Sequence, residues 1–344
     1  MAYTQDSGTV SDELHSSTSP VFTEETISKI LALTTKDNDS VTFDTATSSG
    51  GTVVFDDGTE FGFLTTSANS PVTVSGGPAV LGLQSSTGVT VVVNDGSLTD
   101  VTGFGVPDGV ILGSAGNDNI TTAGNLDRFI SLGTGNSTVV SGAGSDTVQA
   151  GLGNATISGS ADGHDIVELG GNASDYTVSI DNGHAIVTHN ADAKTTDITK
   201  IQYVQLDAGK ALVFAENTEQ AAIATLYETT FGRTAEAGGL QYWFDKASAG
   251  ESLAQIAVDF THSSEFNPVA ALSNTDFITG LYLHTFGRTP EADGLAYWTA
   301  ALEHGATRAQ LMSSFADIAA RNIDGTLHTE ATVVGSVTIV HDIV

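Results

Sequence analysis

The sequence predicts a multidomain chain, a β-solenoid followed by an all-α domain built from two related helical repeats. Three observations predict this fold class. Short β-branched runs punctuated by Gly, Asp, Asn and Ser begin at Val41, a pattern typical of short strands joined by tight turns. A nine-residue repeat then occupies residues 113–166, which favours a solenoid over a sandwich or barrel. After residue 216 a motif with helical periodicity occurs twice.

We expect six parts along the chain. They are a polar N-terminal tether or cap (1–40), a β-solenoid-like region (41–112), a roll of nine-residue repeats (113–166), capping strands with a hairpin (167–215), a duplicated helical domain (216–325) and a tail (326–344). Within the first part we expect one amphipathic helix from Thr23 to Thr35, because its isoleucines and leucines would share one face.

The composition excludes several partners and kinds of chemistry. The chain has 344 residues, with 41 acidic against 11 basic side chains and a formal net charge of −30. Nucleic acids and anionic membranes need a basic surface, so neither is expected as a partner. Cysteine is absent, so any metal must be held by oxygen or imidazole, and calcium is the leading candidate. No apolar run approaches the roughly 18 residues of a transmembrane helix, and we expect no general secretory signal.

The central repeat has a period of nine residues. Its clearest copies are GSAGNDNI (113–120), LGTGNSTV (132–139), SGAGSDTV (141–148) and AGLGNATI (150–157). The glycines that recur at this spacing are Gly124, Gly133, Gly142 and Gly151, and the apolar residues are Ile130, Val139, Val148, Ile157 and Ile166. We expect each repeat to be one turn, with glycines at positive φ, followed by one short inward-facing strand.

This segment resembles the GGxGxDxUx repeats of RTX (haemolysin-type calcium-binding) proteins. The resemblance implies a parallel β-roll in which two repeats form one coil and Ca²⁺ lies between stacked turns, held by Asp carboxylates and backbone carbonyls. Carried over to this chain, it gives a set of candidate metal ligands: Asp118, Asp127, Gly142, Gly144, Asp146, Gly163 and Asp165.

The candidate ligands are expected on two edges of the roll. One edge would stack the equally spaced Asp127, Asp146 and Asp165 and hold one or two ions. The other edge would stack Asp118, Ser137 and Ala155 and hold few ions or none. The first edge is irregular, because Leu126 replaces a turn glycine and the turn GSADGHD (159–165) is one residue longer. The alternative is a degenerate solenoid that keeps its shape without ions.

The segments that follow also carry family resemblances. Residues 167–215, with an Asn182-Gly183 hairpin turn, are similar to the terminal strands that follow RTX repeats and would cap the open edge of the roll. The copies LYETTFGRTAEAGGLQYW (226–243) and LYLHTFGRTPEADGLAYW (281–298) are identical at most positions. They resemble a domain of unknown function found near the C-termini of secreted RTX-type proteins.

The helical motif predicts specific local roles. In each copy a Tyr and a Phe four residues apart share one helix face, and the next residue, Gly232 or Gly287, ends the helix. The following arginines, Arg233 and Arg288, each have a Glu three residues on, so a pair that braces the turn is favoured over a ligand-binding arginine. The tryptophans of the motif are expected as core anchors, with a carbohydrate site as the alternative.

Catalytic signatures are not found: the chain has no HExxH, GxSxG, Walker or strand-linked GxGxxG motif. We therefore do not expect an enzyme. The tail ends in Asp342, Ile343 and Val344, which resembles the uncleaved secretion signal of RTX proteins exported through a type I channel. An ordinary final strand is the alternative.

Together these features predict a secreted, extracellular calcium-binding protein with a structural or adhesive role in a bacterial surface layer, matrix or biofilm. Its expected partners are calcium, the type I secretion channel, and either further copies of itself or a cell-surface or matrix polymer. The alternative is a secreted polysaccharide-active enzyme of the lyase or epimerase type, or its non-catalytic module, because β-solenoids also host such enzymes.

Overall fold

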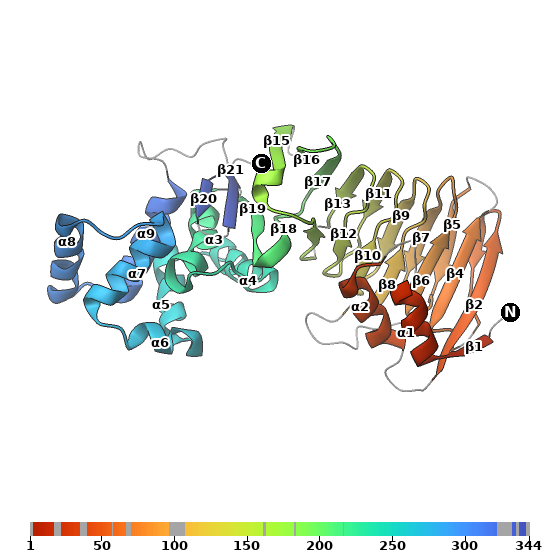
Figure 1. The fold of residues 1–344 in the computed structure, drawn as a ribbon, viewed down its shortest axis with the longest axis horizontal. Helices are drawn as coiled ribbons and strands as arrows, with labels where there is room; N and C mark the ends of the chain where they lie inside the picture. The colour runs from red at the N-terminus through yellow and green to blue at the C-terminus, as the bar shows by residue number, and fades with distance from the viewer. Residues whose placement is uncertain are drawn as a thin grey trace. The chain divides into compact units, whose positions relative to one another are not determined.

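The computed structural model confirms a parallel β-solenoid followed by a helical region (Figure 1). It describes residues 3–16, 22–34, 40–56, 58–66, 70–95, 107–160, 163–181, 184–215, 217–321, 332–334 and 337–341. The chain divides into two compact units, Met1–Leu169 with His184–Ile201, and Gly170–Gly183 with Gln202–Val344.

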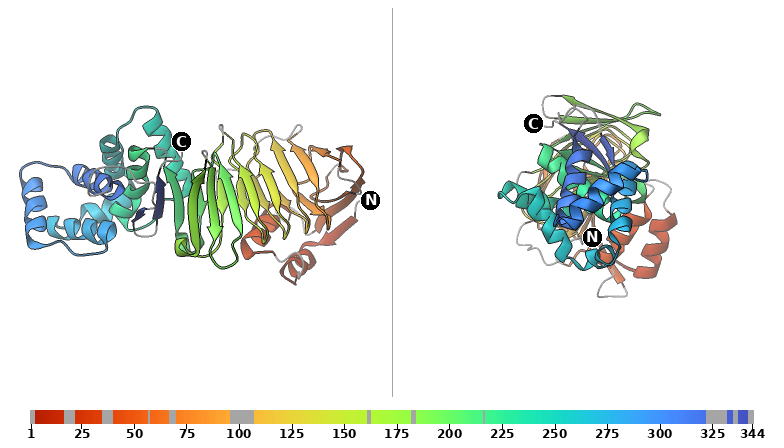
Figure 2. Two further views of the ribbon diagram at one scale, coloured as in Figure 1. Left: turned by 90° about the horizontal axis from the view of Figure 1, so that it is seen from above. Right: turned by 90° about the vertical axis from the view of Figure 1, so that its left-hand side faces the viewer.

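The solenoid consists of two parallel sheets joined by turns (Figure 2). The solenoid strands of the first sheet are β2 (Ser40–Ser48), β4 (Phe61–Thr66), β6 (Val80–Gln84), β8 (Gly109–Leu112), β10 (Arg128–Ser131), β12 (Thr147–Gln149) and β14 (Ile166–Glu168). Those of the second are β3 (Gly51–Val53), β5 (Val72–Ser75), β7 (Thr90–Asn94), β9 (Asn119–Ala123), β11 (Ser137–Val140), β13 (Ala155–Ser158) and β17 (Thr195–Thr199). β1 (Tyr3–Asp6) and β16 (His184–His189) pair antiparallel with β2 and β17. In both sheets the ladder of hydrogen-bonded strands is therefore continuous from the strands before residue 113 to those of the nine-residue repeats.

The apolar residues of the repeat form the inner core, as the period predicts. Ile130 lies opposite Val148, and Val148 lies opposite Val167, in neighbouring coils. All three side chains are fully buried, which stabilises the stack through the hydrophobic effect. The expectation was wrong by one residue in the last coil, where Val167 rather than Ile166 takes the inward position, because the preceding turn has an extra residue.

The repeat glycines serve a different purpose from the one expected. Among them Gly124 has a positive φ of 126°, but Gly133, Gly142 and Gly151 do not. Their coils instead approach so closely that a Cβ at Gly151 would lie 1.9 Å from the carbonyl oxygen of Gly133. The glycines are needed because any side chain would separate the stacked turns.

Two N-terminal helices cover the outer face of the first sheet: α1 (Ser7–Ser16), which sequence analysis missed, and α2 (Glu24–Thr34), which confirms the expected helix. Ile27 and Ile30 of α2 belong to a buried cluster with aromatic residues such as Phe43 and Phe129. Figure 1 shows both helices against the strands of the solenoid. The N-terminal part is therefore a cap packed on the roll.

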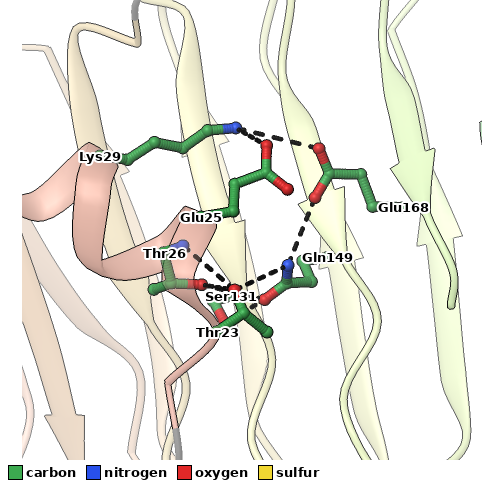
Figure 3. A network of polar contacts seen from close by, with 7 residues as sticks. All are labelled: Thr23, Glu25, Thr26, Lys29, Ser131, Gln149 and Glu168. Atoms are coloured by element: carbon green, nitrogen blue, oxygen red, sulfur yellow. Dashed lines mark hydrogen bonds and ion pairs between the residues drawn. The ribbon is translucent and has the colours of Figure 1, made fainter. Parts of the chain in front are cut away.

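Polar contacts fix α2 in place (Figure 3). Thr26 donates a hydrogen bond to Gln149 of β12 at 3.0 Å. The Lys29 ammonium lies 2.9 Å from a Glu25 oxygen, 3.8 Å from a Glu168 oxygen and 3.9 Å from the centre of the Phe129 ring. Glu168 is 8% exposed, so the lysine supplies a positive charge to a carboxylate removed from water.

The second unit combines short strands with the helical repeats. Its strands are β15 (Tyr176–Asp181), β18 (Tyr203–Gln205), β19 (Ala211–Ala215), β20 (Thr332–Val334) and β21 (Val337–His341). Its helices are α3 (Thr218–Phe231), α4 (Ala237–Ser248), α5 (Leu253–His262), α6 (Asn267–Ala270), α7 (Asn274–Phe286), α8 (Ala292–Glu303) and α9 (Arg308–Ala320). β21, from the tail, pairs parallel with β19. The Asn182-Gly183 turn and residues 342–344 lie outside the described residues. Within the described residues, no helix has the length and apolarity to span a bilayer.

Candidate functional site

The register of the solenoid places two of the predicted aspartates in one column. Thr147 lies opposite Ile166 and Phe129 lies opposite Thr147, so the preceding residues, Asp146 and Asp165, stack in successive coils. The residue beneath Asp146 is Arg128. The expected stack of three aspartates was therefore wrong at Asp127, because the coil from Arg128 to Asp146 is one residue shorter than the coil that follows it.

The carboxylates of Asp146 and Asp165 are bound by neutral donors. Asp146 accepts hydrogen bonds from the backbone nitrogen of Arg128 (2.8 Å) and from the Thr122 hydroxyl (3.1 Å). Asp165 accepts one from the backbone nitrogen of Asp146 (2.9 Å) and one from the Ser141 hydroxyl (2.8 Å). Each carboxylate thus joins its own turn to the coil before it, which is a structural role that needs no ion.

Burial perturbs both groups. Asp146 is fully buried and Asp165 is 6% exposed. Burial, followed by the nearby Asp165 charge, raises the pKa of Asp146 to about 7. Burial is also the main reason that the pKa of Asp165 is raised. Two carboxylates held close together away from water create a local demand for positive charge.

The turns around this pair are lined with backbone oxygens. A Cβ would lie 2.7 Å from the Gly124 carbonyl oxygen at Gly142, 2.3 Å from the Leu126 oxygen at Gly144, and 2.0 Å from the Gly144 oxygen at Gly163. The three predicted glycines therefore lie in this corner, close to carbonyl groups of the neighbouring turn. Carboxylate and carbonyl oxygens are the ligands that calcium takes.

The two remaining predicted residues lie elsewhere. Asp127 accepts a hydrogen bond from the Ser145 backbone nitrogen at 2.7 Å, outside the column of Asp146 and Asp165. Asp118 stacks with Ser137 as predicted for the other edge. It is 2% exposed and accepts hydrogen bonds from Ser114 and from the Val89 backbone nitrogen. It is the only carboxylate in the described part of that column.

The donor set has the right chemistry for calcium but is small. Within the described ranges, no three acidic or histidine side chains converge on one point. A calcium ion in this corner would be held by Asp146 and Asp165 with turn carbonyls, fewer than the six to eight oxygens of a complete site, so water would have to supply the rest. Such a site belongs to the weak end of the range.

Arg128 and Asp95 were not among the residues predicted from the sequence. The Arg128 guanidinium is 5% exposed and lies 2.9 Å from an Asp95 oxygen. The signal was present in the repeat: Asp118 and Asp146 each stand two residues before a buried apolar residue, Ile120 or Val148. By that rule the residue two before Ile130 is Arg128, not Asp127.

The helical repeats confirm most of their predicted local roles. Gly232 and Gly287 end α3 and α7 with φ of 69° and 64°. In the first repeat, Phe260 contacts the rings of Tyr227 (4.7 Å), Phe231 (5.7 Å) and Trp243 (5.3 Å). Phe315 contacts the equivalent rings in the second repeat. The arginines of both motifs pair with the predicted glutamates, Arg233 with Glu236 and Arg288 with Glu291.

Comparison with known proteins supports the duplication. A family model described as "Domain of unknown function (DUF4214)" matches residues 213–270 and again residues 257–319. The two matches together span the helical repeats and leave the solenoid unmatched. No curated protein and no solved structure matches the chain.

Proposed function

We propose that this chain is a secreted calcium-binding protein with a structural or adhesive role in a bacterial surface layer, matrix or biofilm. The solenoid would be a spacer of the RTX type, and the duplicated helical domain would be the interaction module. The proposal combines the parallel solenoid, the sequence resemblance of its turns to RTX repeats, and the acidic composition.

One observation carries the calcium part: Asp146 and Asp165 stack in register, nearly or fully buried, and the donors that the described residues direct at the Asp146 oxygens, at 2.8–3.2 Å, are neutral. A divalent cation would neutralise the two carboxylates. Without it, a carboxylate loses its charge by taking up a proton. The cation would also use ligands of its preferred type. Glycines on the facing turns keep the backbone oxygens close.

A weak site suits a protein that works outside the cell. Extracellular modules bind calcium with dissociation constants of about 10⁻⁴–10⁻³ M. An ion that binds the folded state alone stabilises that state by mass action. The acidic solenoid would thus fold more firmly where calcium is abundant, after export of a looser chain through the type I channel.

Thermal unfolding with millimolar CaCl₂ and with EGTA tests the calcium part. We expect calcium to raise the melting temperature of the wild-type chain by several degrees. The double variant Asp146→Asn/Asp165→Asn should lose this increment. Asp118→Asn is the matched control: it removes an equally buried, hydrogen-bonded carboxylate that stands alone in its column, so it should lower stability in both buffers but keep the calcium increment. Equal melting temperatures of the wild type in CaCl₂ and EGTA would refute calcium binding.

Electron microscopy tests the structural part. Purified protein incubated with calcium should form sheets or fibres, or decorate cell-surface material, if it is a scaffold or adhesin. The alternative of a polysaccharide-active enzyme rests on fold class alone, and we do not propose it.

A further inference from the structure

The two helical repeats hold equivalent arginines in different surroundings. Arg233 of the first repeat meets two carboxylates. Its Nε and Nη2 donate to the two oxygens of Glu265 at 2.6 and 2.9 Å, and its Nη1 donates to Glu236 at 3.0 Å. The Glu265 contact is the paired geometry in which a guanidinium binds a carboxylate most specifically.

Arg288, at the same place in the second repeat, lacks the second carboxylate. Its Nη1 donates to Glu291, the counterpart of Glu236, and weakly to the Thr289 carbonyl at 3.5 Å. In the described part of the chain no other acidic group contacts it. Its side chain is 50% exposed, compared with 34% for Arg233. The edge of the guanidinium that Glu265 would occupy is therefore open.

A difference in helix length explains the missing partner. α5 ends at His262, and the extended Ser263 directs the chain into the short turn Ser264–Phe266, which carries Glu265. In the second repeat α9 continues without a break to Ala320. Ala320 is the residue at the position of Glu265 and is 2% exposed. The second repeat thus has no turn at this point that could bring a carboxylate to Arg288.

In both repeats the arginine nevertheless lies over the tyrosine at the same position of the motif. The Arg233 guanidinium carbon lies 4.9 Å from the Tyr227 ring, and the Arg288 carbon lies 5.3 Å from the equivalent ring of Tyr282. Phe286, 37% exposed, lies 5.9 Å from the Arg288 guanidinium carbon. Stacking and the Glu291 pair restrict the guanidinium, which lowers the entropy cost of binding a further group.

We propose that Arg288 is an open carboxylate-binding site, and that its occupant is a glutamate side chain of a protein partner bound as Glu265 is bound by Arg233. The first repeat identifies the chemistry, because there the occupant is a glutamate on a turn that follows a helix. The inference goes beyond the proposed function and depends on neither calcium nor the solenoid.

A peptide with the sequence of residues 263–268, Ser-Ser-Glu-Phe-Asn-Pro, blocked at both ends, is the probe. We expect the wild-type chain to bind it with a stoichiometry of one, as measured by NMR shifts of arginine Nε–H groups. A peptide with Gln in place of Glu should not bind. Arg288→Gln should weaken binding at least tenfold. Arg321→Gln is the matched control: Arg321 is similarly exposed and pairs with one carboxylate, that of Asp317, so its loss should leave binding unchanged.

A variant that opens a second binding site, at Arg233, makes the test sharper. Glu265→Gln should open Arg233 and raise the stoichiometry to two, and Glu265→Gln/Arg288→Gln should return it to one. Trigalacturonate, which offers carboxylates on a saccharide, should bind more weakly than the peptide. The proposal is overturned if the peptide fails to bind, if Arg288→Gln binds it like the wild type, or if trigalacturonate binds and the peptide does not. Melting curves of each variant confirm that it is folded.

Discussion

The backbone nitrogen of Arg128 donates a hydrogen bond to Asp146 of the next coil at 2.8 Å, in a column where the sequence suggested an aspartate. The Arg128 side chain meanwhile forms an ion pair with Asp95, which also accepts hydrogen bonds from the backbone nitrogens of Asn125 and Leu126. One internal cation thus joins the end of β7 to the turn before β10. The Arg128 charge also lowers the pKa of Asp146, although burial and the Asp165 charge outweigh it.

Arg128→Met should destabilise the solenoid strongly. The substitution keeps an unbranched side chain but leaves the Asp95 carboxylate, 13% exposed, without its counter-charge. Removing one member of a buried ion pair costs about 3–5 kcal/mol, and we expect a loss near the lower end in urea unfolding. The double variant Asp95→Asn/Arg128→Met is the control and should lose less than the sum of the single changes. Additive losses would mean that the pair contributes little.

The sequence predicted the solenoid because the evidence for it is local and periodic. Glycines and apolar residues recur every nine residues, and burial of Ile130 and Val148 follows directly from that period. The spacing between the aspartates misplaced Asp127, because successive coils differ in length by one residue. Counting two residues back from each buried apolar residue would have placed Arg128 in the column, and the strand pairing shows the same register.

The other contacts that were not predicted join residues far apart in the sequence. The glycines that end α3 and α7, and the pairing of Arg233 with Glu236, involve residues only a few positions apart. They could therefore be predicted from the sequence. Contacts such as Lys29 with Glu168, or Arg233 with Glu265, join segments far apart in the sequence. No local pattern marks such partners, and the open state of Arg288 is visible only by comparing the two repeats in space.

Gly144→Ala should disrupt stacking of the turns. Its Cβ would lie 2.3 Å from the Leu126 carbonyl oxygen, and a backbone oxygen cannot move aside as a flexible side chain could. We expect a loss of several kcal/mol or failure to fold, measured by thermal unfolding. Gly280→Ala in α7 is the matched control, because a Cβ there meets nothing within 4 Å. It should stabilise the helix by about 1 kcal/mol. Equal effects at both positions would contradict close stacking of the coils.

Phe260→Ala should destabilise the first helical repeat. Phe260 is 3% exposed and contacts Tyr227, Phe231 and Trp243, so truncation leaves a cavity among rings. Such changes typically cost about 3–5 kcal/mol. Tryptophan fluorescence should report unfolding, since Trp243 lies in this cluster in the folded state. Phe315→Ala makes the same change in the second repeat and should have a similar cost, whereas a cost below about 1 kcal/mol for either would show a loosely packed cluster.

Glu168 should make the stability of the folded chain fall as pH rises. Burial, opposed by Lys29 and reinforced by Glu25, raises the pKa of Glu168 from 4.5 to about 7. Between these values the folded state holds a proton that the unfolded state has released, so the contribution of this group is complete below pH 4.5 and is lost as pH rises through 7. Asp146, with its pKa also raised to about 7, acts in the same direction.

Glu168→Gln isolates the contribution of this carboxylate. Glutamine mimics the protonated acid, keeps an acceptor for Gln149, and leaves Lys29 its partner Glu25. We expect the variant to be more stable than the wild type above pH 7 and to show a shallower fall in unfolding free energy between pH 4.5 and 7, measured by urea titration at a series of pH values. Glu25→Gln removes the neighbouring carboxylate that reinforces the raised pKa of Glu168, so it should reduce the fall in stability without abolishing it. Parallel profiles for the wild type and Glu168→Gln would show that the buried contact between α2 and β14 does not titrate in this range.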